Sequence, residues 1–598
     1  MISPTGITNH SDSSQKVDYW RGLGGLRGDL GGFLKGWSYD ANVQYSHNKG
    51  KYRTEQILQD VYDASLYQST SCVGTTLPVS GKQCMDLPWT DPFFLAGQLT
   101  PEQVGYLFSW EEGVTKYTQL SSEASISGHL FDLPAGPVGM ALGITGRRDS
   151  INDKPGYITL AGNAWGASTS GITAGYSLTK EAFGELQVPL LKDKPFFRNL
   201  ELSGAARITN VKAVRRLDGL TDKNTGNWTY KVGANWAVSQ WLRFRGTYGT
   251  SFRAPALFEQ FKANETSFPS ARRIDPCVRT AQNLAQGAIS QRIFDNCAAA
   301  GIPDNYPGGS ISATVSSQGG IGALVPETSK AKTASVILTP SFAFLPRTRI
   351  NLAVDYFDIS VKGEVSQLGA GNILRGCYDS PTFPTDPLCS LFTRGRGSDA
   401  FTVNTVNDRY INIASQRNKG LDFTLLVSQS IDRLGSPRLL ANTTYQLKDN
   451  FALFVGTGQS NNGDIGDPKF VGDVNLTWSA PGGWTTFWGT DIIGKSSNNR
   501  KFKEANGGSL CPQTSAVYGD YCVFLKTPTM FYHSASVTKE IGKKFEITLG
   551  MRNIFDTRPP RVTTIGGAGI PSLIGPVVGT SQYDLLGRRI FLNVSRSL

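Results

Sequence analysis

The chain has 598 residues and no run that approaches the roughly 18 continuous apolar residues of a membrane-spanning helix. Its mean hydropathy of -0.22 also argues against a helical membrane protein. Residues 1–16 contain neither the basic segment nor the apolar segment of a signal peptide, so we predict none within this sequence. These absences exclude the helical membrane classes.

Histidine is scarce, and the residue sets of common metal sites and enzymes are missing. Four histidines lie far apart, and no cysteine pair has the CxxC spacing of a zinc site. No Ser/His/Asp or Cys/His set recurs, so we predict no enzyme activity, no metal and no cofactor. The net charge is +11, but the basic residues are scattered along the chain, which argues against a nucleic-acid partner.

The eight cysteines fall into four close pairs, which indicates disulfides formed in an oxidising compartment. Each bridge would close a short loop and add about 2–3 kcal/mol of stability by restricting the unfolded chain. Eight free thiols are the alternative. The expected pairs are Cys72–Cys84, Cys277–Cys297, Cys377–Cys389 and Cys511–Cys522.

Residues 37–48, WSYDANVQYSHN, alternate between apolar or aromatic side chains and polar ones. This period of two predicts a β-strand with one dry face and one wet face. The pattern recurs along the whole chain. We predict about seventeen strands, near residues 17–30, 37–55, 112–131, 138–152, 177–191, 199–213, 228–239, 241–254, 327–342, 348–365, 409–430, 438–454, 467–480, 484–495, 528–541, 545–557 and 582–598.

The connections between these strands differ in length in a regular way. Short ones, such as residues 132–137 and 481–483, alternate with long ones, such as residues 56–111 and 255–326, and every cysteine lies in a long one. Short turns at one end and long loops at the other are typical of an outer-membrane β-barrel. A soluble sandwich would have turns every 8–12 residues without this asymmetry.

The order of side chains on the dry face predicts what the dry face contacts. In residues 37–48, Trp37 and Tyr39 lie near one end, Tyr45 lies near the other, and small apolar residues lie between them. Aromatic residues that flank an apolar band are typical of a lipid-facing wall. We therefore predict an all-β, transmembrane, antiparallel barrel with a polar lumen.

Four stretches resemble sequences of TonB-dependent outer-membrane receptors. Residues 583–598, YDLLGRRIFLNVSRSL, resemble the family's C-terminal strand, and residues 552–560, RNIFDTRPP, resemble its Asn-Leu-Phe-Asp segment. Residues 248–261 resemble the family's Ser-Phe-Arg-Ala-Pro strand end, and residues 324–340 resemble its Pro-Glu-Thr hairpin. The matching residues of the last strand are Gly587, Arg588, Ile590, Leu592 and Val594, whereas Leu598 stands where the family commonly has an aromatic residue.

The resemblance implies a 22-stranded barrel that an N-terminal plug fills from inside, and uptake of a scarce ligand with energy from the TonB complex. It also implies residence in the outer membrane of a Gram-negative cell, with membrane lipid, the TonB complex and the barrel-assembly machinery as partners. The machinery would recognise the last strand.

We expect residues 1–16 to form an unstructured stub and residues 17–598 to form the barrel domain. The plug, the TonB-contacting segment and the first strands are then missing, and the chain is the C-terminal part of a longer receptor. Alternatively, residues 156–176 and 400–408 each hide a further strand.

Candidate ligand contacts come from the predicted lumen and the long loops. Loop aromatic residues could stack on sugar, catecholate or porphyrin rings, although they could equally pack the loop on itself. Basic residues in the lumen could bind an anion or hold the plug, and those near Cys277 make an anion-friendly loop. The candidates are Trp89, Phe93, Phe94, Trp110, Arg243, Arg245, Arg253, Arg272 and Arg273.

These patterns favour a receptor for a small molecule such as a siderophore, or for an oligosaccharide. A plugless passive pore and a surface adhesin are the alternatives. Loss of uptake on deletion of TonB would indicate the receptor. Steady conductance would indicate the pore, and cell binding without a proton gradient would indicate the adhesin.

Overall fold

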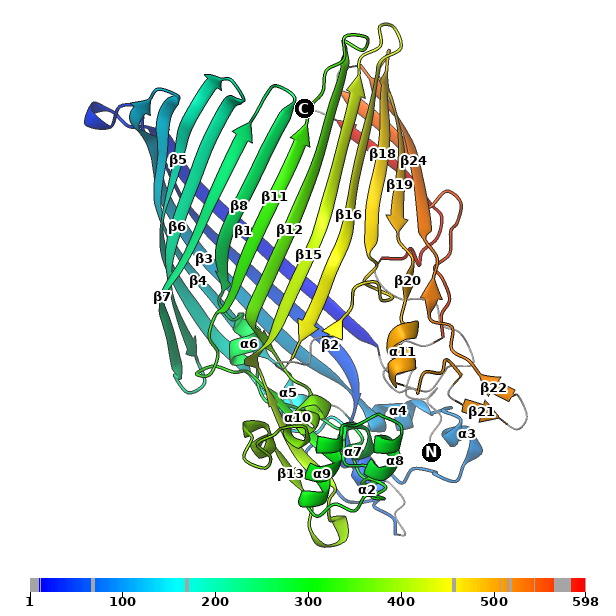
Figure 1. The fold of residues 1–598 in the computed structure, drawn as a ribbon. Coiled ribbons are helices and arrows are strands. Elements are labelled where there is room, and N and C mark those ends of the chain that lie inside the picture. The colour runs from blue at the N-terminus through cyan, green and yellow to red at the C-terminus, as the bar shows by residue number, and fades with distance from the viewer. Residues whose placement is uncertain are drawn as a thin grey trace.

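The computed structural model describes residues 10, 12–65, 70–166, 171–453, 459–505, 507–511, 513–515, 519–542, 544–563 and 582–596. Most of these residues form one antiparallel sheet that curves around a hollow (Figure 1). Its strands are β1 (Ser13–Asp29), β2 (Ser38–Ile57), β3 (Phe108–Leu133), β4 (Gly136–Lys154), β5 (Thr173–Lys194), β6 (Phe197–Arg215), β7 (Thr221–Ala237), β8 (Leu242–Arg253), β11 (Glu327–Leu338), β12 (Thr348–Ser366), β15 (Ile411–Gln429), β16 (Ser436–Ala452), β17 (Gln459–Ser460), β18 (Phe470–Ala480), β19 (Trp484–Ile493), β24 (Met530–Ile541), β25 (Phe545–Arg552) and β26 (Arg589–Arg596).

The remaining elements are short and lie in the connections. Helices are η1 (Gly32–Leu34), α2 (Gln59–Ser65), α3 (Pro92–Leu95), α4 (Pro101–Leu107), α5 (Tyr157–Leu160), α6 (Leu257–Phe261), α7 (Ala271–Ile274), α8 (Thr280–Ala285), α9 (Gln291–Ala299), α10 (Ala370–Tyr378), η2 (Pro387–Leu391), η3 (Gly397–Asp399) and α11 (Asn499–Ala505). Short strands are β9 (Glu265–Ser267), β10 (Thr314–Gln318), β13 (Phe392–Arg394), β14 (Val403–Arg409), β20 (Ser496–Ser497), β21 (Gln513–Ser515), β22 (Gly519–Tyr521) and β23 (Lys526–Thr527). Within the described ranges, no helix is long and apolar enough to cross a membrane.

Every strand that the alternating pattern predicts is present in the large sheet, and successive strands pair with each other. The sheet has 18 strands because β17 adds a two-residue strand beside β16. Among the described residues, β1 pairs with β2 alone and β26 with β25 alone, so these two strands are the edges. The fold class that the periodicity predicts is confirmed.

Many strand ends differ from the sequence-based prediction by a few residues, and three of these differences are instructive. β1 begins at Ser13, so residues 13–16 belong to the sheet rather than to a stub. β7 begins at Thr221 because pairing continues through a polar stretch that shows no apolar period. β26 begins only at Arg589. Most of the expected stub and Leu598 lie outside the described residues.

The two segments that could contain a further strand differ in their structure. Part of residues 156–176 is helix α5. Residues 403–409 do form a strand, β14, but it belongs to a separate four-stranded sheet with the order β13-β14-β10-β9. Where the structure describes them, neither segment adds a further strand to the wall, and residues 173–176 belong to β5.

Turns and loops gather at opposite ends of the sheet (Figure 1). Short connections, such as residues 134–135 between β3 and β4, lie at the end that we call the turn side. Helices α2 to α11 lie at the other end, the loop side. One loop-side connection is short, residues 216–220 between β6 and β7. The predicted asymmetry is otherwise present.

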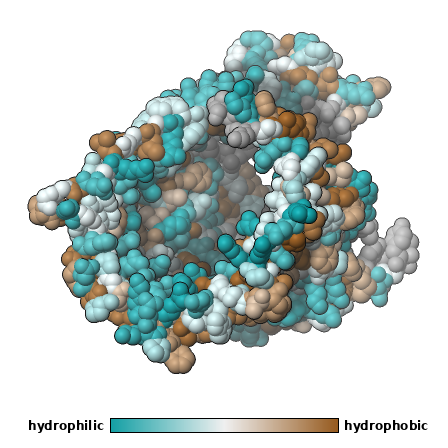
Figure 2. Space-filling view, turned by 90° about the horizontal axis from the view of Figure 1, so that it is seen from above, coloured by the Kyte–Doolittle hydropathy of each residue, from teal (hydrophilic) through white to brown (hydrophobic). Residues whose placement is uncertain are grey.

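Alternating side chains give the wall a polar inner face and an apolar outer face. On β26 the outward residues Ile590, Leu592 and Val594 are 69%, 67% and 58% exposed, which is typical of side chains that meet lipid rather than a protein core. Many hydrophilic residues line the hollow seen from the turn side (Figure 2). At Gly143 an added Cβ would lie 2.3 Å from the ring of Phe183 on the next strand, so only glycine admits this ring.

Candidate ligand-binding surfaces

The polar face of the wall carries networks in which charges are already paired. Glu181 of β5 accepts hydrogen bonds of 2.8 Å from Thr145, Arg207 and Thr209 on the neighbouring strands. Asp149 of β4 is held by Gln119, Tyr117 and Arg147 in a similar way. These charged hydrogen bonds tie neighbouring strands together and occupy both carboxylates.

The predicted lumen arginines lie on one face of β8, and they differ in how strongly they are held. Arg245 forms an ion pair of 3.2 Å with Asp355 of β12. Arg243 makes only a 3.4 Å contact with the side-chain oxygen of Asn235. Of these two, Arg243 is the more available to a bound anion.

Arg253, the third lumen candidate, joins two of the family-like motifs. Its guanidinium donates to both oxygens of Glu259 at 3.1 and 3.0 Å and to Glu327, whose carboxylate also accepts the backbone N–H of Val365. Arg253 is the arginine of the Ser-Phe-Arg-Ala-Pro stretch and ends β8, and Glu327 belongs to the Pro-Glu-Thr stretch. The geometry is that of a structural clamp where β8, β11 and β12 leave the wall.

The other two motifs also meet. The side chain of Asp556 accepts the backbone N–H of Arg588 at 3.0 Å, and an added Cβ on Gly587 would lie 2.7 Å from the same carboxylate. Gly587 also has a φ of 72°, in the left-handed region that favours glycine. The Asn-Ile-Phe-Asp segment thus holds the chain just before β26.

The predicted aromatic loop divides into core and surface. Phe94 is 1% exposed and packs edge-to-face against Trp89, with ring centroids 5.3 Å apart. Trp110 lies on β3, with the guanidinium of Arg53 4.0 Å from its ring. Phe93 is 65% exposed. Phe93 is therefore the candidate whose ring is free to stack on a ligand.

Two long loops, residues 254–326 and 367–410, combine into a compact unit that we call the loop lobe. They share the four-stranded sheet, in which β10 and β14 run parallel. Its core includes Ile373, Leu374 and Val403, all fully buried. The predicted Arg272 and Arg273 lie on helix α7 of this lobe and are exposed.

A buried ion pair ties the two halves of the lobe together. Arg394 of β13 donates to both carboxylate oxygens of Asp275 at 2.7 Å, and also to the hydroxyl of Tyr378 at 2.8 Å. The side chain of Asp275 is 2% exposed and that of Arg394 13%. The two loops of the lobe therefore pack together as one unit.

All four predicted disulfides are present with the predicted pairing. Two of them lie in the loop lobe, and Cys277 and Cys297 there are almost fully buried. Each bridge stabilises its loop by restricting the unfolded chain. The loops are thus fixed in shape on the loop side.

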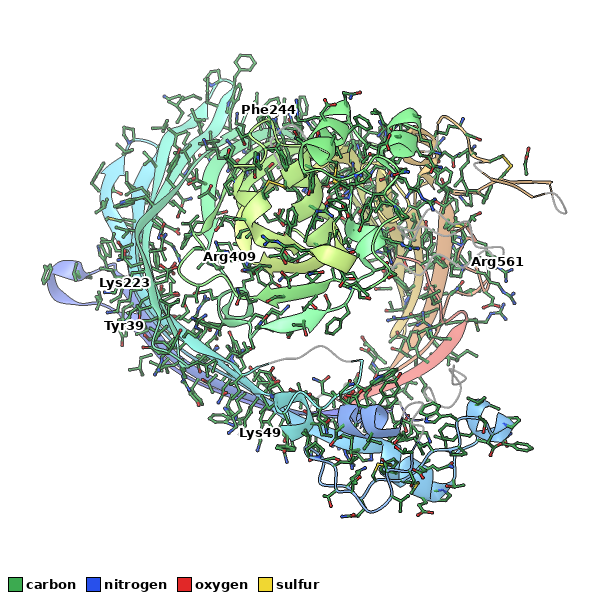
Figure 3. All side chains as sticks on the ribbon, turned by 90° about the horizontal axis from the view of Figure 1, so that it is seen from below. Tyr39, Lys49, Lys223, Phe244, Arg409 and Arg561 are labelled. Carbon is green, nitrogen blue, oxygen red and sulfur yellow. A yellow bond between two sulfur atoms is a disulfide. The ribbon has the colours of Figure 1, made fainter. Side chains whose placement is uncertain are left out.

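Arg409 is a candidate that the sequence patterns do not reveal. It ends β14, is exposed, and has no carboxylate within ion-pair distance among the described residues. Viewed from the loop side, the lobe lies across the opening and Arg409 lies over the hollow (Figure 3). No signal in residues 403–409 places this side chain there, because the position depends on the packing of two distant loops.

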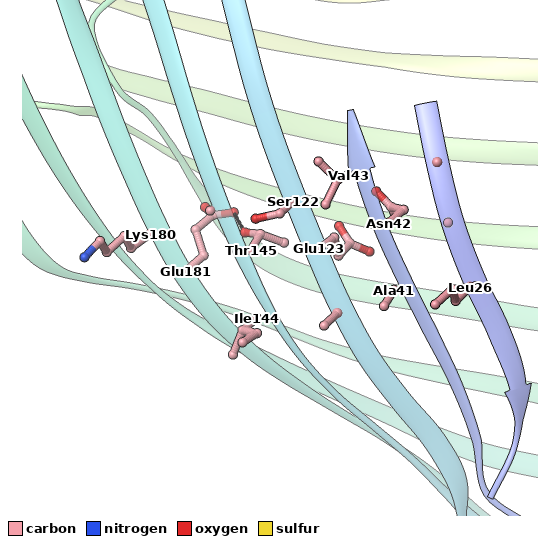
Figure 4. A pocket seen from close by; sticks show the side chains of 14 residues that line it. Leu26, Ala41, Asn42, Val43, Ser122, Glu123, Ile144, Thr145, Lys180 and Glu181 are labelled. Atoms are coloured by element: carbon pink, nitrogen blue, oxygen red, sulfur yellow. Dashed lines mark hydrogen bonds between the residues drawn. The ribbon is translucent and has the colours of Figure 1, made fainter. Parts of the chain in front are cut away.

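A hollow of about 780 Å³ on the wall itself lies over β1 to β5. Small residues such as Gly24, Ala41 and Ala124 leave it shallow, and Ile144 shares their face. Thr145 and Glu181 point to the other side and are joined by a hydrogen bond (Figure 4). This hollow belongs to the apolar face and not to the lumen.

The sequence matches the family described as TonB dependent receptor-like, beta-barrel, over residues 3–554. The chain belongs to this family. Its members are outer-membrane receptors and transporters, not enzymes, in agreement with the prediction of no enzyme activity. No curated protein matches the sequence.

Solved receptors share the fold at low sequence identity. The pyoverdine receptor FpvA of Pseudomonas aeruginosa PAO1, solved with pyoverdine, gives a TM-score of 0.52 at 10% identity, covering 98% of this chain and 63% of FpvA. The hemophore receptor HasR of Serratia marcescens gives 0.50 at 12% identity, covering 98% and 66%. The copper transporter OprC gives 0.50 at 12% identity, covering 98% and 67%. The chain thus spans 63–67% of the length of these three proteins.

Proposed function

We propose that this chain forms the outer-membrane barrel of a receptor that takes up a scarce anionic ligand, of which a siderophore is the best-supported class. The observation that carries the proposal is Arg409, which has no ion-pair partner in the part of the chain that the structure describes and which the lobe holds over the hollow. Arg243, on the inner face near the turn-side start of β8, is also only weakly held. An oligosaccharide is the alternative ligand, because exposed Phe93 could stack on a sugar ring.

We further propose that the chain works as part of a longer receptor. An unpaired strand edge in lipid leaves backbone groups unsatisfied at a cost of several kcal/mol each. β1 and β26 present such edges among the described residues, so further strands would close the barrel. A plug within that barrel would contact the TonB complex, and the barrel-assembly machinery would insert it through β26.

Uptake by cells that carry the natural full-length gene tests the function. We expect accumulation of radiolabelled ferric siderophore that stops when TonB is deleted. Arg409→Ala should weaken binding about tenfold or more, because a charged hydrogen bond contributes roughly 1.5–3 kcal/mol. Arg273→Ala, which removes another exposed arginine of the lobe, should leave binding unchanged. Uptake that persists without TonB would indicate a passive pore, and cell binding without uptake would indicate an adhesin.

A further inference from the structure

Lysines lie directly opposite each other on neighbouring strands at four places in the wall. In one of them, Lys419 with Lys448 on β15 and β16, Lys419 is paired with Asp358 at 3.1 Å. The other three have no such partner among the described residues. The register pairs Lys16 with Lys51 on β1 and β2, Lys49 with Lys116 on β2 and β3, and Lys212 with Lys223 on β6 and β7. Like charges directly opposite each other in a sheet destabilise it. None of the six lysines has an ion-pair partner among the described residues, although Asp18 lies opposite Lys49 on β1.

All three pairs lie on the outer face of the barrel. Lys49 follows Val43 and Tyr45 at even spacing on β2, and those two side chains are 54% and 37% exposed. Lys212 lies one residue from Val211, which shares the inner face with Thr209. Lys49 and Lys223 lie along the outer rim of the wall, together with Tyr39 (Figure 3).

A β-bulge turns Lys223 outward. The register shifts between Thr209 and Val211 on β6, where β7 places two residues, 225 and 226, opposite the single residue 210 of β6. Gly226 has a φ of 74°, and its N–H donates to the side chain of Asn210 at 2.7 Å, which holds the bulge. Without this bulge Lys223 would face the lumen, because a one-residue slip reverses the faces of a strand.

The pairs lie toward the loop-side ends of their strands. Lys212 is three residues before the end of β6 at Arg215, and Lys223 is two residues after the start of β7 at Thr221. Lys49 lies ten residues from Tyr39 along β2, which is roughly 33 Å at about 3.3 Å per residue. A strand tilted by about 45° spans a band of about 25 Å over that length. The ammonium groups of Lys49 and of Lys116 opposite it therefore lie at the level of lipid headgroups on the loop side.

We propose that the paired lysines bind phosphate groups of lipid headgroups in the leaflet on the loop side. An anion between two lysines removes their mutual repulsion, and lysine binds phosphate as a point charge. The inference rests on the membrane placement proposed above. It commits to the phosphorylated lipid of that leaflet rather than to phosphate in solution.

Reconstitution of the full chain in nanodiscs tests the proposal. The discs contain either a bis-phosphorylated glycolipid or its dephosphorylated form, and mass spectrometry measures the glycolipid retained after detergent washing. We expect preference for the phosphorylated form, a fall in that preference with salt, and a loss of roughly fivefold for each lysine removed in Lys212→Gln/Lys223→Gln. Lys212→Arg/Lys223→Arg should retain the preference.

The control is Lys231→Gln, which removes an exposed lysine of the same strand from the inner face. It should bind lipid as the unchanged chain does. Equal retention of both glycolipids, equal loss in the control, or full competition by inorganic phosphate would overturn the lipid site. Failure of the chain to enter nanodiscs would overturn the membrane placement as well, whereas entry without preference would overturn the lipid site alone.

Discussion

The buried ion pair of the loop lobe gives the sharpest prediction. The side chain of Asp275 is 2% exposed with Arg394 in place, so Arg394→Ala removes the ion-pair partner of a buried carboxylate. The backbone N–H of Cys277 remains as a donor at 3.0 Å. Breaking a buried pair by removing one partner costs about 3–5 kcal/mol. Because each 1.36 kcal/mol is a factor of ten, the lobe should open about 10²- to 10⁴-fold more often.

Hydrogen exchange read by mass spectrometry measures this opening in peptides from residues 254–326 and 367–410. Protection in the wall strands should stay unchanged, because the pair lies wholly within the lobe. Arg273→Ala is the matched control, since it removes an exposed arginine of the same lobe. It should change the free energy of opening by less than about 0.5 kcal/mol.

A second variant separates the lost charge partner from lost packing. Replacing both members with apolar residues, as in Arg394→Met/Asp275→Leu, removes the uncompensated carboxylate and should restore most of the protection. If Arg394→Ala exchanges like Arg273→Ala, the ion pair does not hold the lobe together. If the double variant opens as often as Arg394→Ala, the cost comes from packing and our reasoning is refuted.

Three further predictions concern the loops. Asp408 is 7% exposed, its Oδ1 has no hydrogen-bond partner among the described residues, and burial raises its pKa. The lobe should therefore lose stability as pH rises from the ordinary aspartate range through that raised pKa. Asp408→Asn should make the stability of the lobe less dependent on pH, as measured by hydrogen exchange between pH 4 and 8. Phe94→Ala should destabilise its loop by about 3–5 kcal/mol in the same assay, whereas Phe93→Ala should leave the loop intact and weaken only ligand binding, measured by titration calorimetry. Cys277→Ser/Cys297→Ser should lower lobe stability by about 3 kcal/mol, seen as faster proteolysis of residues 254–326; unchanged proteolysis would show that packing alone holds the loop.

Local periodicity determined the wall. A strand with one lipid-facing side must alternate, so residues 37–48 already show the class of fold, and the same pattern placed every long strand. The two-sided loop lengths and the close cysteine pairs are also local properties. The prediction falls short where the pattern disappears, as in the polar residues 221–227, which the structure adds to β7.

The availability of each candidate side chain depended on contacts between distant segments. Arg253 meets Glu327, 74 residues further along the chain, only because β8 and β11 pair in one register. Phe93 and Phe94 are neighbours in sequence, yet one is exposed and the other buried.

The sequence by itself therefore determined the barrel, its two ends and its disulfides, because each depends on spacing within one segment. Only the tertiary structure decided that Arg409 lies over the hollow and that Lys223 faces outward. The first depends on the parallel pairing of β10 with β14, from two separate loops, and the second on a bulge that alternation does not reveal. Long-range pairing sets which charges are neutralised and which remain for a partner.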